Sequence, residues 1–372
     1  MKRLHYSLFI LPVCLISCAA ARKSDSDTGR IIYANKKTAY FSVSGEPERT
    51  WNISPHIERD TLTVTCYEPA ETLRFRTDRD SLRLQVRAGQ TIYFTVRLPD
   101  SMNALTVVHG VSPFRQISFG RDKVANDSIR SWYGFQADGY RDSLRNKYPY
   151  TPLSTQDDIS RIAAILDWTH RQWKHNGGQS PKKNDAISIL DEVKTGGRFP
   201  CFAYSIVLAA RLNEAGYPAR VLYLKGSDVE TNKVVPGHVV TEAYIPSLHK
   251  WAFLDGQFNA MPMLNGRPLN AVEFQQAATR DFSKLTFYNG VDYNGSPMSR
   301  KNYAEFVYPY LFFFDYYFDS RSGTTARYNV MGKQGLMLVP KGVKPPEKFG
   351  AFDGRIDYVI YTNDEELFYR AP

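Results

Sequence analysis

The hydrophobic pattern of this 372-residue chain changes once along its length, and the change predicts its architecture. Between residues 31 and 119, apolar and polar residues alternate in short runs such as Leu82–Val86 and Thr91–Leu98, as in strands with one buried face. From Ile159 to Trp173 the apolar residues instead recur at helical spacing. Because strands come first and helices follow, we expect an α+β protein that begins with an antiparallel β-sandwich.

The same patterns divide the chain into consecutive parts. We expect the following order: a β-sandwich at 31–119, a polar connector at 120–154 with a helix near Asp138–Lys147, a second domain at 155–295, and a β-rich C-terminal region at 296–372. A chain of this length exceeds what one hydrophobic core commonly serves, which agrees with three packed units. The sandwich carries no visible catalytic group, so we expect a spacer or a binding module.

The first residues are typical of an export leader. Two basic residues precede the apolar stretch Leu8–Ile16, which is too short to span a bilayer. The stretch runs into the sequence Leu-Ile-Ser-Cys at 15–18, which resembles the lipobox of bacterial lipoproteins. The sequence therefore predicts a signal peptide at 1–17 and a lipid anchor on Cys18.

This reading predicts an extracytoplasmic protein that is anchored to a bacterial membrane through Cys18, with a flexible polar tether at 18–30. The alternative is ordinary signal cleavage near residues 19–21, which would discard Cys18. Both routes take the protein out of the cytoplasm.

The charge of the chain gives little support to a nucleic-acid partner. The net charge of +9 comes from 47 basic and 38 acidic residues, which are spread along the chain and not gathered into a run. Hydrophobic residues at 43% and charged residues at 23% fit a globular protein, so neither wholesale disorder nor a multi-span membrane protein is indicated.

A helix-favouring run begins at Cys201, directly after Pro200, and closes at Gly216. Cys201 is therefore expected in the first helical turn. There, unsatisfied backbone N–H groups and the helix dipole stabilise a negative charge, which suits a thiolate nucleophile.

Three runs that follow this helix are typical of strands: Ala219–Leu224, His238–Ile245 and Trp251–Asp255. The last two are separated by a short loop and are expected to form a hairpin. Such a hairpin would bring His238 and Asp255 to the same end of neighbouring strands, where a carboxylate can orient an imidazole.

These residues, in this order, resemble the transglutaminase-like superfamily. Its Gly-x-Pro-Ala-Arg signature appears at Gly216–Arg220, its His-Ala-Trp-x-Glu strand at His238–Glu242, and its Trp-x-x-x-Asp strand at Trp251–Asp255. The resemblance covers the chain from about Thr155 to Phe258. It implies a papain-like core in the central domain.

The resemblance also implies a catalytic triad of Cys201, His238 and Asp255 and a covalent mechanism. The Cys201 thiolate would attack an amide or acyl carbonyl, His238 would protonate the leaving amine, and Asp255 would orient the histidine. Water would then hydrolyse the thioester, whereas an amine would give acyl transfer. We favour a hydrolase that acts on a peptide, protein or cell-wall amide, and we expect neither a cofactor nor a metal.

The sequence departs from the family pattern around the triad. Val239 and Val240 replace the usual Ala-Trp, Gly256 replaces a common proline, and Phe199–Pro200 replace small residues before the cysteine. These changes bear on substrate and rate more than on the triad.

The oxyanion of the reaction is expected to be held by the Cys201 backbone N–H and one further donor. The candidates for that donor are Trp173, Gln179 and Asn184. Each is better explained by a structural role.

Two alternatives remain for Cys201 itself. In an oxidising compartment it could form a disulfide with Cys66, which otherwise reads as a buried strand residue. The domain could also be a non-catalytic binding module with a vestigial triad, since fold resemblance alone does not establish activity.

Other conspicuous residues have structural explanations. His170, His175 and His249 lack the spacing of metal ligands. Arg220 and Glu242 are expected to be architectural. The aromatic stretch at 303–318 is expected to be a strand packed on the core, with a groove lining as the alternative.

Overall fold

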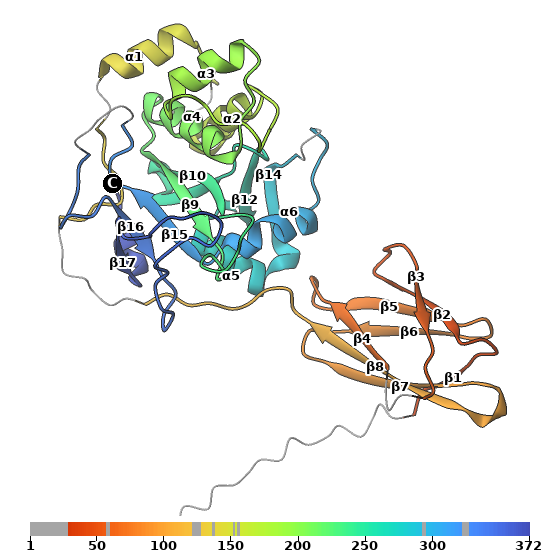
Figure 1. Cartoon of the computed structure of the whole chain (residues 1–372). Coiled ribbons are helices and arrows are strands. Elements are labelled where there is room, and N and C mark those ends of the chain that lie inside the picture. The colour runs from red at the N-terminus through yellow and green to blue at the C-terminus, as the bar shows by residue number, and fades with distance from the viewer. Residues whose placement is uncertain are drawn as a thin grey trace, which may run out of the picture. The chain divides into compact units, whose positions relative to one another are not determined.

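The computed structural model describes residues 29–56, 60–120, 128–135, 138–151, 153–154, 157–291, 295–321 and 327–372. They divide into two compact units, Met1–Ser112 and Pro113–Pro372 (Figure 1). The predicted leader and the anchor residue Cys18 lie outside the described residues. Within these segments, no helix has both the length and the apolar character needed to cross a membrane.

The first unit is a sandwich of two four-stranded sheets, ordered β1-β7-β8-β4 and β3-β2-β5-β6. Its strands are β1 (Ile31–Tyr33), β2 (Thr38–Val43), β3 (Arg49–Asn52), β4 (Asp60–Thr65), β5 (Glu71–Arg76), β6 (Ser81–Val86), β7 (Thr91–Arg97) and β8 (Asn103–Val111). Alternate residues of these strands are buried and share one core, which includes Leu73, Phe75 and Phe94. The predicted period-two pattern therefore marks one inward face on each sheet.

The sandwich is not purely antiparallel. β1 pairs with β7, and β4 pairs with β8, in parallel. Parallel neighbours need a crossover connection, and between β4 and β8 the chain passes through β5 and β6 of the opposite sheet. This connection cannot be read from the alternation of residues along a single strand.

The second unit is built around a six-stranded sheet in the order β11-β10-β9-β15-β16-β17, together with a three-stranded sheet in the order β13-β12-β14. The strands are β9 (Ala219–Lys225), β10 (His238–Ile245), β11 (Lys250–Leu254), β12 (Ala260–Leu264), β13 (Arg267–Pro268), β14 (Leu285–Asn289), β15 (Phe313–Tyr317), β16 (Gly335–Leu338) and β17 (Val359–Thr362). The predicted α+β class and the expected β10–β11 hairpin are confirmed.

The helices of the second unit are α1 (Asp138–Lys147), α2 (Asp158–His170), α3 (Ala186–Lys194), α4 (Cys201–Glu214), α5 (Ala271–Arg280), α6 (Arg300–Val307) and α7 (Glu365–Phe368). Helices α1–α4 gather beside β9 and β10 in Figure 1. Helix α4 is buried along most of its length, and it contacts both strands. The N-cap of α2 is Asp157, whose side chain accepts from two backbone N–H groups.

The segment expected to be a polar connector belongs to the second unit. The Ser131 carbonyl accepts a hydrogen bond from Arg220, and the Trp132 indole donates to the Ala219 carbonyl at 3.1 Å. Leu144 of α1 is buried. These contacts tie the segment to β9 and to the helices beside it.

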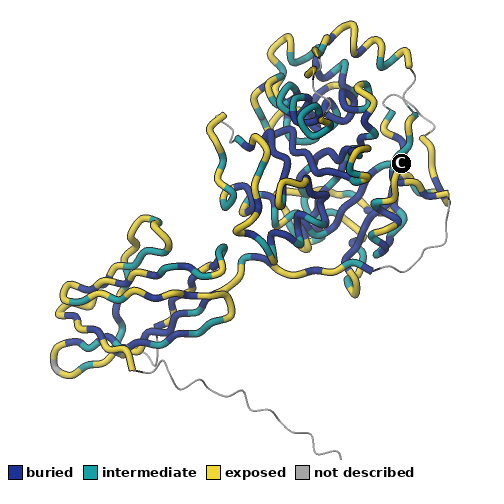
Figure 2. The backbone as a smooth tube through the Cα atoms, turned by 180° about the vertical axis from the view of Figure 1, so that it is seen from behind, coloured by how far each residue is buried: buried dark blue, intermediate teal, exposed yellow. Residues whose placement is uncertain are grey.

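The C-terminal region does not form a separate unit, because β15, β16 and β17 extend the sheet that contains β9 and β10. Residues expected as one aromatic strand begin with α6, and the strand itself covers Phe313–Tyr317. Ser299 caps α6, and Pro309 lies in the short 3-10 helix that separates α6 from β15. Figure 2 shows buried backbone running through the strands and helices of this unit.

Candidate active site

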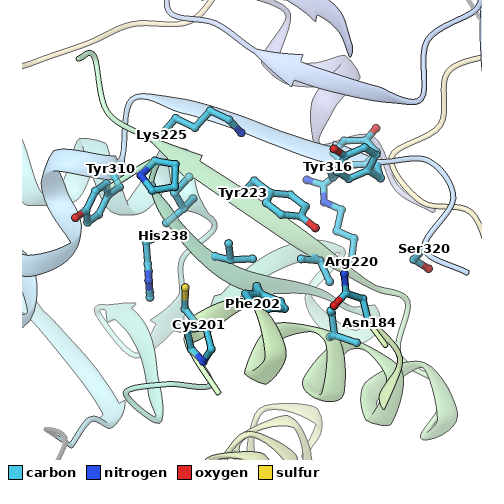
Figure 3. Close-up of a pocket in the computed structure, with 18 of the residues that line it drawn as sticks. Asn184, Cys201, Phe202, Arg220, Tyr223, Lys225, His238, Tyr310, Tyr316 and Ser320 are labelled. Carbon is cyan, nitrogen blue, oxygen red and sulfur yellow. The ribbon is translucent and has the colours of Figure 1, made fainter. Parts of the chain in front are cut away.

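Cys201 is the first residue of α4, with Pro200 in an extended conformation as the N-cap residue. Its half-buried side chain lines a cavity of about 1370 Å³ (Figure 3). The backbone N–H groups of the first helical turn stabilise a thiolate at this position. The hydroxyl of Ser205 lies 2.9 Å from the Val239 carbonyl and so links α4 to the strand that carries the histidine.

His238 is the first residue of β10 and pairs with Leu224 of β9. The preceding residue, Gly237, has a φ of +152°. A Cβ atom there would lie 2.1 Å from the Leu224 carbonyl oxygen, so the backbone requires glycine at this point. The close approach fixes where β10 begins and therefore where the imidazole lies.

The His238 Nε2 lies 2.8 Å from Oδ2 of Asp255, and both side chains are buried. Asp255 follows β11, and its other oxygen, Oδ1, accepts the backbone N–H groups of Gln257 at 3.0 Å and Phe258 at 3.2 Å. The hairpin brings the two residues together as the sequence predicted. The carboxylate is oriented by backbone donors and holds the imidazole from one side.

Because Nε2 of His238 is bonded to Asp255, the remaining ring nitrogen, Nδ1, is the one available to the neighbouring Cys201 side chain (Figure 3). Burial by itself lowers the pKa of His238, but the Asp255 carboxylate and Cys201 outweigh it and raise the pKa to about 10. At neutral pH the histidine is therefore an imidazolium placed between a carboxylate and the cysteine sulfur. This is the arrangement that a cysteine nucleophile requires.

Tyr303 is a site residue that sequence reasoning missed. Its hydroxyl donates to Oδ2 of Asp255 at 2.8 Å, and burial followed by the nearby carboxylate raises the pKa of Tyr303 well above its usual value. On the same helix, the ring of Phe306 lies 5.1 Å from the His238 ring, edge to face. A cap at Ser299 followed by aromatic residues three positions apart is a helical signal that could have revealed this pair.

His175 also lines the cavity, although the sequence suggested only a surface or core role. Burial lowers the pKa of His175, and the positive charge of His238 lowers it further. A neutral imidazole is therefore favoured beside the charged one.

Gly256 explains one departure from the family pattern. A Cβ atom on Gly256 would lie 3.1 Å from the Cβ of Tyr204, so a larger residue would crowd α4. The Gly256 carbonyl lies 3.2 Å from Nδ1 of His170, which gives that histidine a structural partner.

Three cations of the cavity wall are each paired with a carboxylate: Arg220 with Glu242 at 2.7 Å, Lys225 with Asp315, and Arg321 with Asp319 at 2.6 Å. Arg220 also donates to two backbone carbonyls, which agrees with an architectural role. Aromatic side chains make up much of the remaining wall, including Phe202, Tyr223, Tyr310 and Tyr316 (Figure 3). Part of the 303–318 stretch therefore lines the cavity, which is the alternative to the core-packed strand that was expected.

The candidate oxyanion donors have different surroundings. The Trp173 indole donates to the Phe199 carbonyl at 3.0 Å and is occupied. The Gln179 carbonyl oxygen accepts from the Arg198 backbone, and this residue lines a different, small cavity. Asn184 lines the large cavity, on the far side of Phe202 from Cys201 in Figure 3. The Cys201 backbone N–H remains the donor closest to the nucleophile.

Cys66 and Cys201 are both free thiols, so the disulfide alternative is wrong. Cys66 is buried in the core of the sandwich, and its sulfur lies 3.6 Å from the Val64 and Val86 carbonyl oxygens. Burial raises the pKa of the Cys66 thiol, which keeps it protonated.

Residues 150–256 match the family model of the transglutaminase-like superfamily. This segment contains Cys201, His238 and Asp255, and the recognition made from the sequence is confirmed. No curated protein matches the chain in sequence.

Two solved structures are similar to part of the chain. A candidate cysteine protease from Cytophaga hutchinsonii is 16% identical, with a TM-score of 0.26, over 46% of this chain and 55% of that chain. A candidate protease from Parabacteroides distasonis is 11% identical, with a TM-score of 0.21, over 45% of this chain and 40% of that chain. The match spans about half the length of each of these proteins.

Proposed function

We propose that this chain, whose residues 150–256 form a transglutaminase-like core, is a cysteine hydrolase that cleaves peptide or related amide bonds. One observation carries the proposal: Cys201 and His238 lie side by side at the wall of a large cavity (Figure 3), and His238 is hydrogen-bonded to Asp255. The nucleophile, the proton donor and the orienting carboxylate have the mutual geometry that acyl transfer needs.

The first step forms a thioester. The Cys201 thiolate attacks the carbonyl carbon, and the C=O electron pair moves onto oxygen, where the Cys201 backbone N–H stabilises the charge. When the C–N bond breaks, the leaving amine takes the proton from Nδ1 of His238. Asp255 keeps the imidazole oriented throughout.

The second step returns the enzyme to its starting state. A water molecule gives a proton to Nδ1 of His238 and attacks the thioester carbon, and the C–S bond then breaks to release the acid and the Cys201 thiolate. If an amine takes the place of water, the same step yields a new amide.

The cavity supports an extended substrate. Its volume of about 1370 Å³ exceeds the roughly 300–1,000 Å³ of common small-molecule sites. Three wall cations, Arg220, Lys225 and Arg321, are paired with carboxylates, while Lys183 and Arg327 also line the cavity beside many aromatic side chains. A peptide, protein or cell-wall amide with apolar side chains next to the scissile bond fits these features.

The proposal extends to location. The sequence Leu-Ile-Ser-Cys at 15–18 supports a protein that is exported and held on a membrane by lipid on Cys18. Substrates would then be extracytoplasmic.

The enzyme proposal is tested before a substrate is known by alkylating the folded protein with iodoacetamide at about pH 6. Cys201 should react much faster than an ordinary free cysteine, and Cys66 should be slow because it is buried. His238→Ala should remove most of the low-pH reactivity, whereas Asp255→Ala should reduce it less. Reaction of Cys201 at the rate of an ordinary thiol would instead support a binding module with a vestigial triad.

The substrate is then sought by incubating the protein with pools of peptides and cell-wall fragments. Mass spectrometry should detect thioester adducts that are absent from Cys201→Ala. Product analysis with and without an added amine separates a hydrolase from an acyltransferase, because only the second forms a new amide.

A further inference from the structure

Helix α6 lies outside the residues that match the family model, yet two of its side chains touch the candidate triad. Tyr303 and Phe306 are three positions apart, so they share one face of the helix. The Tyr303 hydroxyl donates to Oδ2 of Asp255 at 2.8 Å, and the Phe306 ring lies 5.1 Å from the His238 ring at 85°. One helix therefore contacts both the carboxylate and the imidazole.

The position of Tyr303 is fixed by its surroundings. Only 1% of its surface is exposed, and its ring packs edge to face against Phe258 and Phe287, with ring centroids 5.6 and 4.9 Å away. The cap at Ser299 holds the start of the helix. Little motion of the hydroxyl is possible in such packing, so the bond to Asp255 is a built feature.

The Tyr303 hydroxyl and the His238 imidazole donate to the same oxygen of the Asp255 carboxylate. Oδ2 of Asp255 accepts from His238 and from Tyr303, while Oδ1 accepts two backbone N–H groups. Each donor takes part of the negative charge of the buried carboxylate. Without the Tyr303 hydroxyl, Oδ2 would face His238 alone and would hold the imidazolium proton more tightly.

We infer that Tyr303 is a positioning residue, which fixes the Asp255 carboxylate and limits how strongly that carboxylate stabilises the His238 imidazolium. The inference deepens the proposed function and rests on it. A less stabilised imidazolium is more acidic, so transfer of its Nδ1 proton to the leaving amine is easier when the carboxylate is shared.

Other titratable groups also face His238. They are Cys201 at the start of α4, His175 after α2, and Tyr310 after α6, whose ring lies 6.3 Å away. These groups are unchanged by a substitution at Tyr303, so a difference between the variant and the natural protein reports on the Asp255 oxygen.

The test is an NMR titration of His238 in the full chain with labelled histidine, in the natural protein and in Tyr303→Phe. Loss of a hydrogen bond to a charged group should move the His238 midpoint upward by about one pH unit. Tyr308→Phe is the matched control, because its hydroxyl donates to the Arg115 carbonyl at 2.6 Å and has no bond to the triad. The control should leave the midpoint unchanged.

A second variant keeps the test informative if Tyr303→Phe fails to fold. Site-specific 3-fluorotyrosine at 303 is nearly the same size, and its more acidic hydroxyl donates more strongly, so the His238 midpoint should move downward. A purely structural tyrosine would lower the melting temperature in Tyr303→Phe and leave the midpoint in place, which would overturn the inference. If the midpoint shifts but no substrate forms an adduct with Cys201, Tyr303 remains a positioning residue and the proposed hydrolase function is contradicted instead.

Discussion

Gly237 and the carbonyl oxygen of Leu224 approach so closely that a Cβ atom on Gly237 would lie 2.1 Å from that oxygen. The next residue, His238, pairs with Leu224 as the first residue of β10. The backbone of β9 therefore fixes the start of β10 and with it the position of the His238 imidazole. Gly237 helps to position the site because it permits this close approach.

Replacing Gly237 with alanine should destabilise the protein and weaken the site. The clash and the φ of +152° would force β10 away from β9, at a cost of about 1–3 kcal/mol. Urea unfolding should show this loss, and Cys201 alkylation at pH 6 should slow. The control is Gly139→Ala in α1, where a Cβ meets open space and a gain of about 0.5–1 kcal/mol is expected. Equal stability of the two variants would contradict the argument.

The charge of His238 should make stability depend on pH. Its pKa in the folded protein is raised to about 10 from an ordinary value of 6.5, so protonation favours the folded state. This contribution is fully present below about pH 6.5 and is lost as the pH rises through about 10. The difference in unfolding free energy between the natural protein and His238→Gln should therefore shrink across that window. A difference that stays constant from pH 6 to pH 10 would refute the raised pKa.

Asp315→Ala should be strongly destabilising, because it leaves the buried Lys225 ammonium without its carboxylate. Breaking a buried pair in this way costs about 3–5 kcal/mol. Asp142→Ala is the matched control, since its bond to Arg145 lies on an exposed surface and should contribute less than about 1 kcal/mol. Chemical denaturation of both variants measures the two costs, and a similar small loss in each would count against the buried pair.

A fragment of residues 113–372 should fold and keep the reactive cysteine, because it contains the triad and the cavity within its own compact unit. Limited proteolysis of the full chain should release a stable fragment that begins near Pro113. A fragment that begins near residue 155 would lack Ser131 and Trp132, which are bonded to β9 residues. Intact-mass analysis identifies the boundary, and an insoluble or unreactive fragment would show that the sandwich is needed.

Cys18→Ala should release the protein from the membrane. The substitution removes the residue that the sequence Leu-Ile-Ser-Cys predicts as the lipid attachment site. Fractionation and labelling with a fatty-acid probe measure the result. Ser17→Thr, which keeps Cys18, serves as the control. Unchanged membrane association of Cys18→Ala would mean that another feature anchors the protein.

The local parts of the site could be predicted from the sequence. Helix α4 and strands β9, β10 and β11 were expected almost at their observed bounds, because hydrophobic period, glycine and proline act over a few residues. The hairpin then required His238 and Asp255 to lie at one end of adjacent strands. The order of three short motifs was enough to identify the transglutaminase-like core.

Contacts between distant segments were decided by the tertiary structure alone. Periodicity shows which face of a strand is buried, but it does not name the neighbouring strand, so the pairing of β15 with β9 across about ninety residues was not foreseen. The same pairing places Asp315 beside Lys225. Tyr303 meets Asp255 because α6 packs there, and no pattern around either residue specifies the other. The sequence by itself thus determined the three residues of the candidate triad, because local patterns and motif order point to them, whereas long-range packing decided what surrounds and orients them.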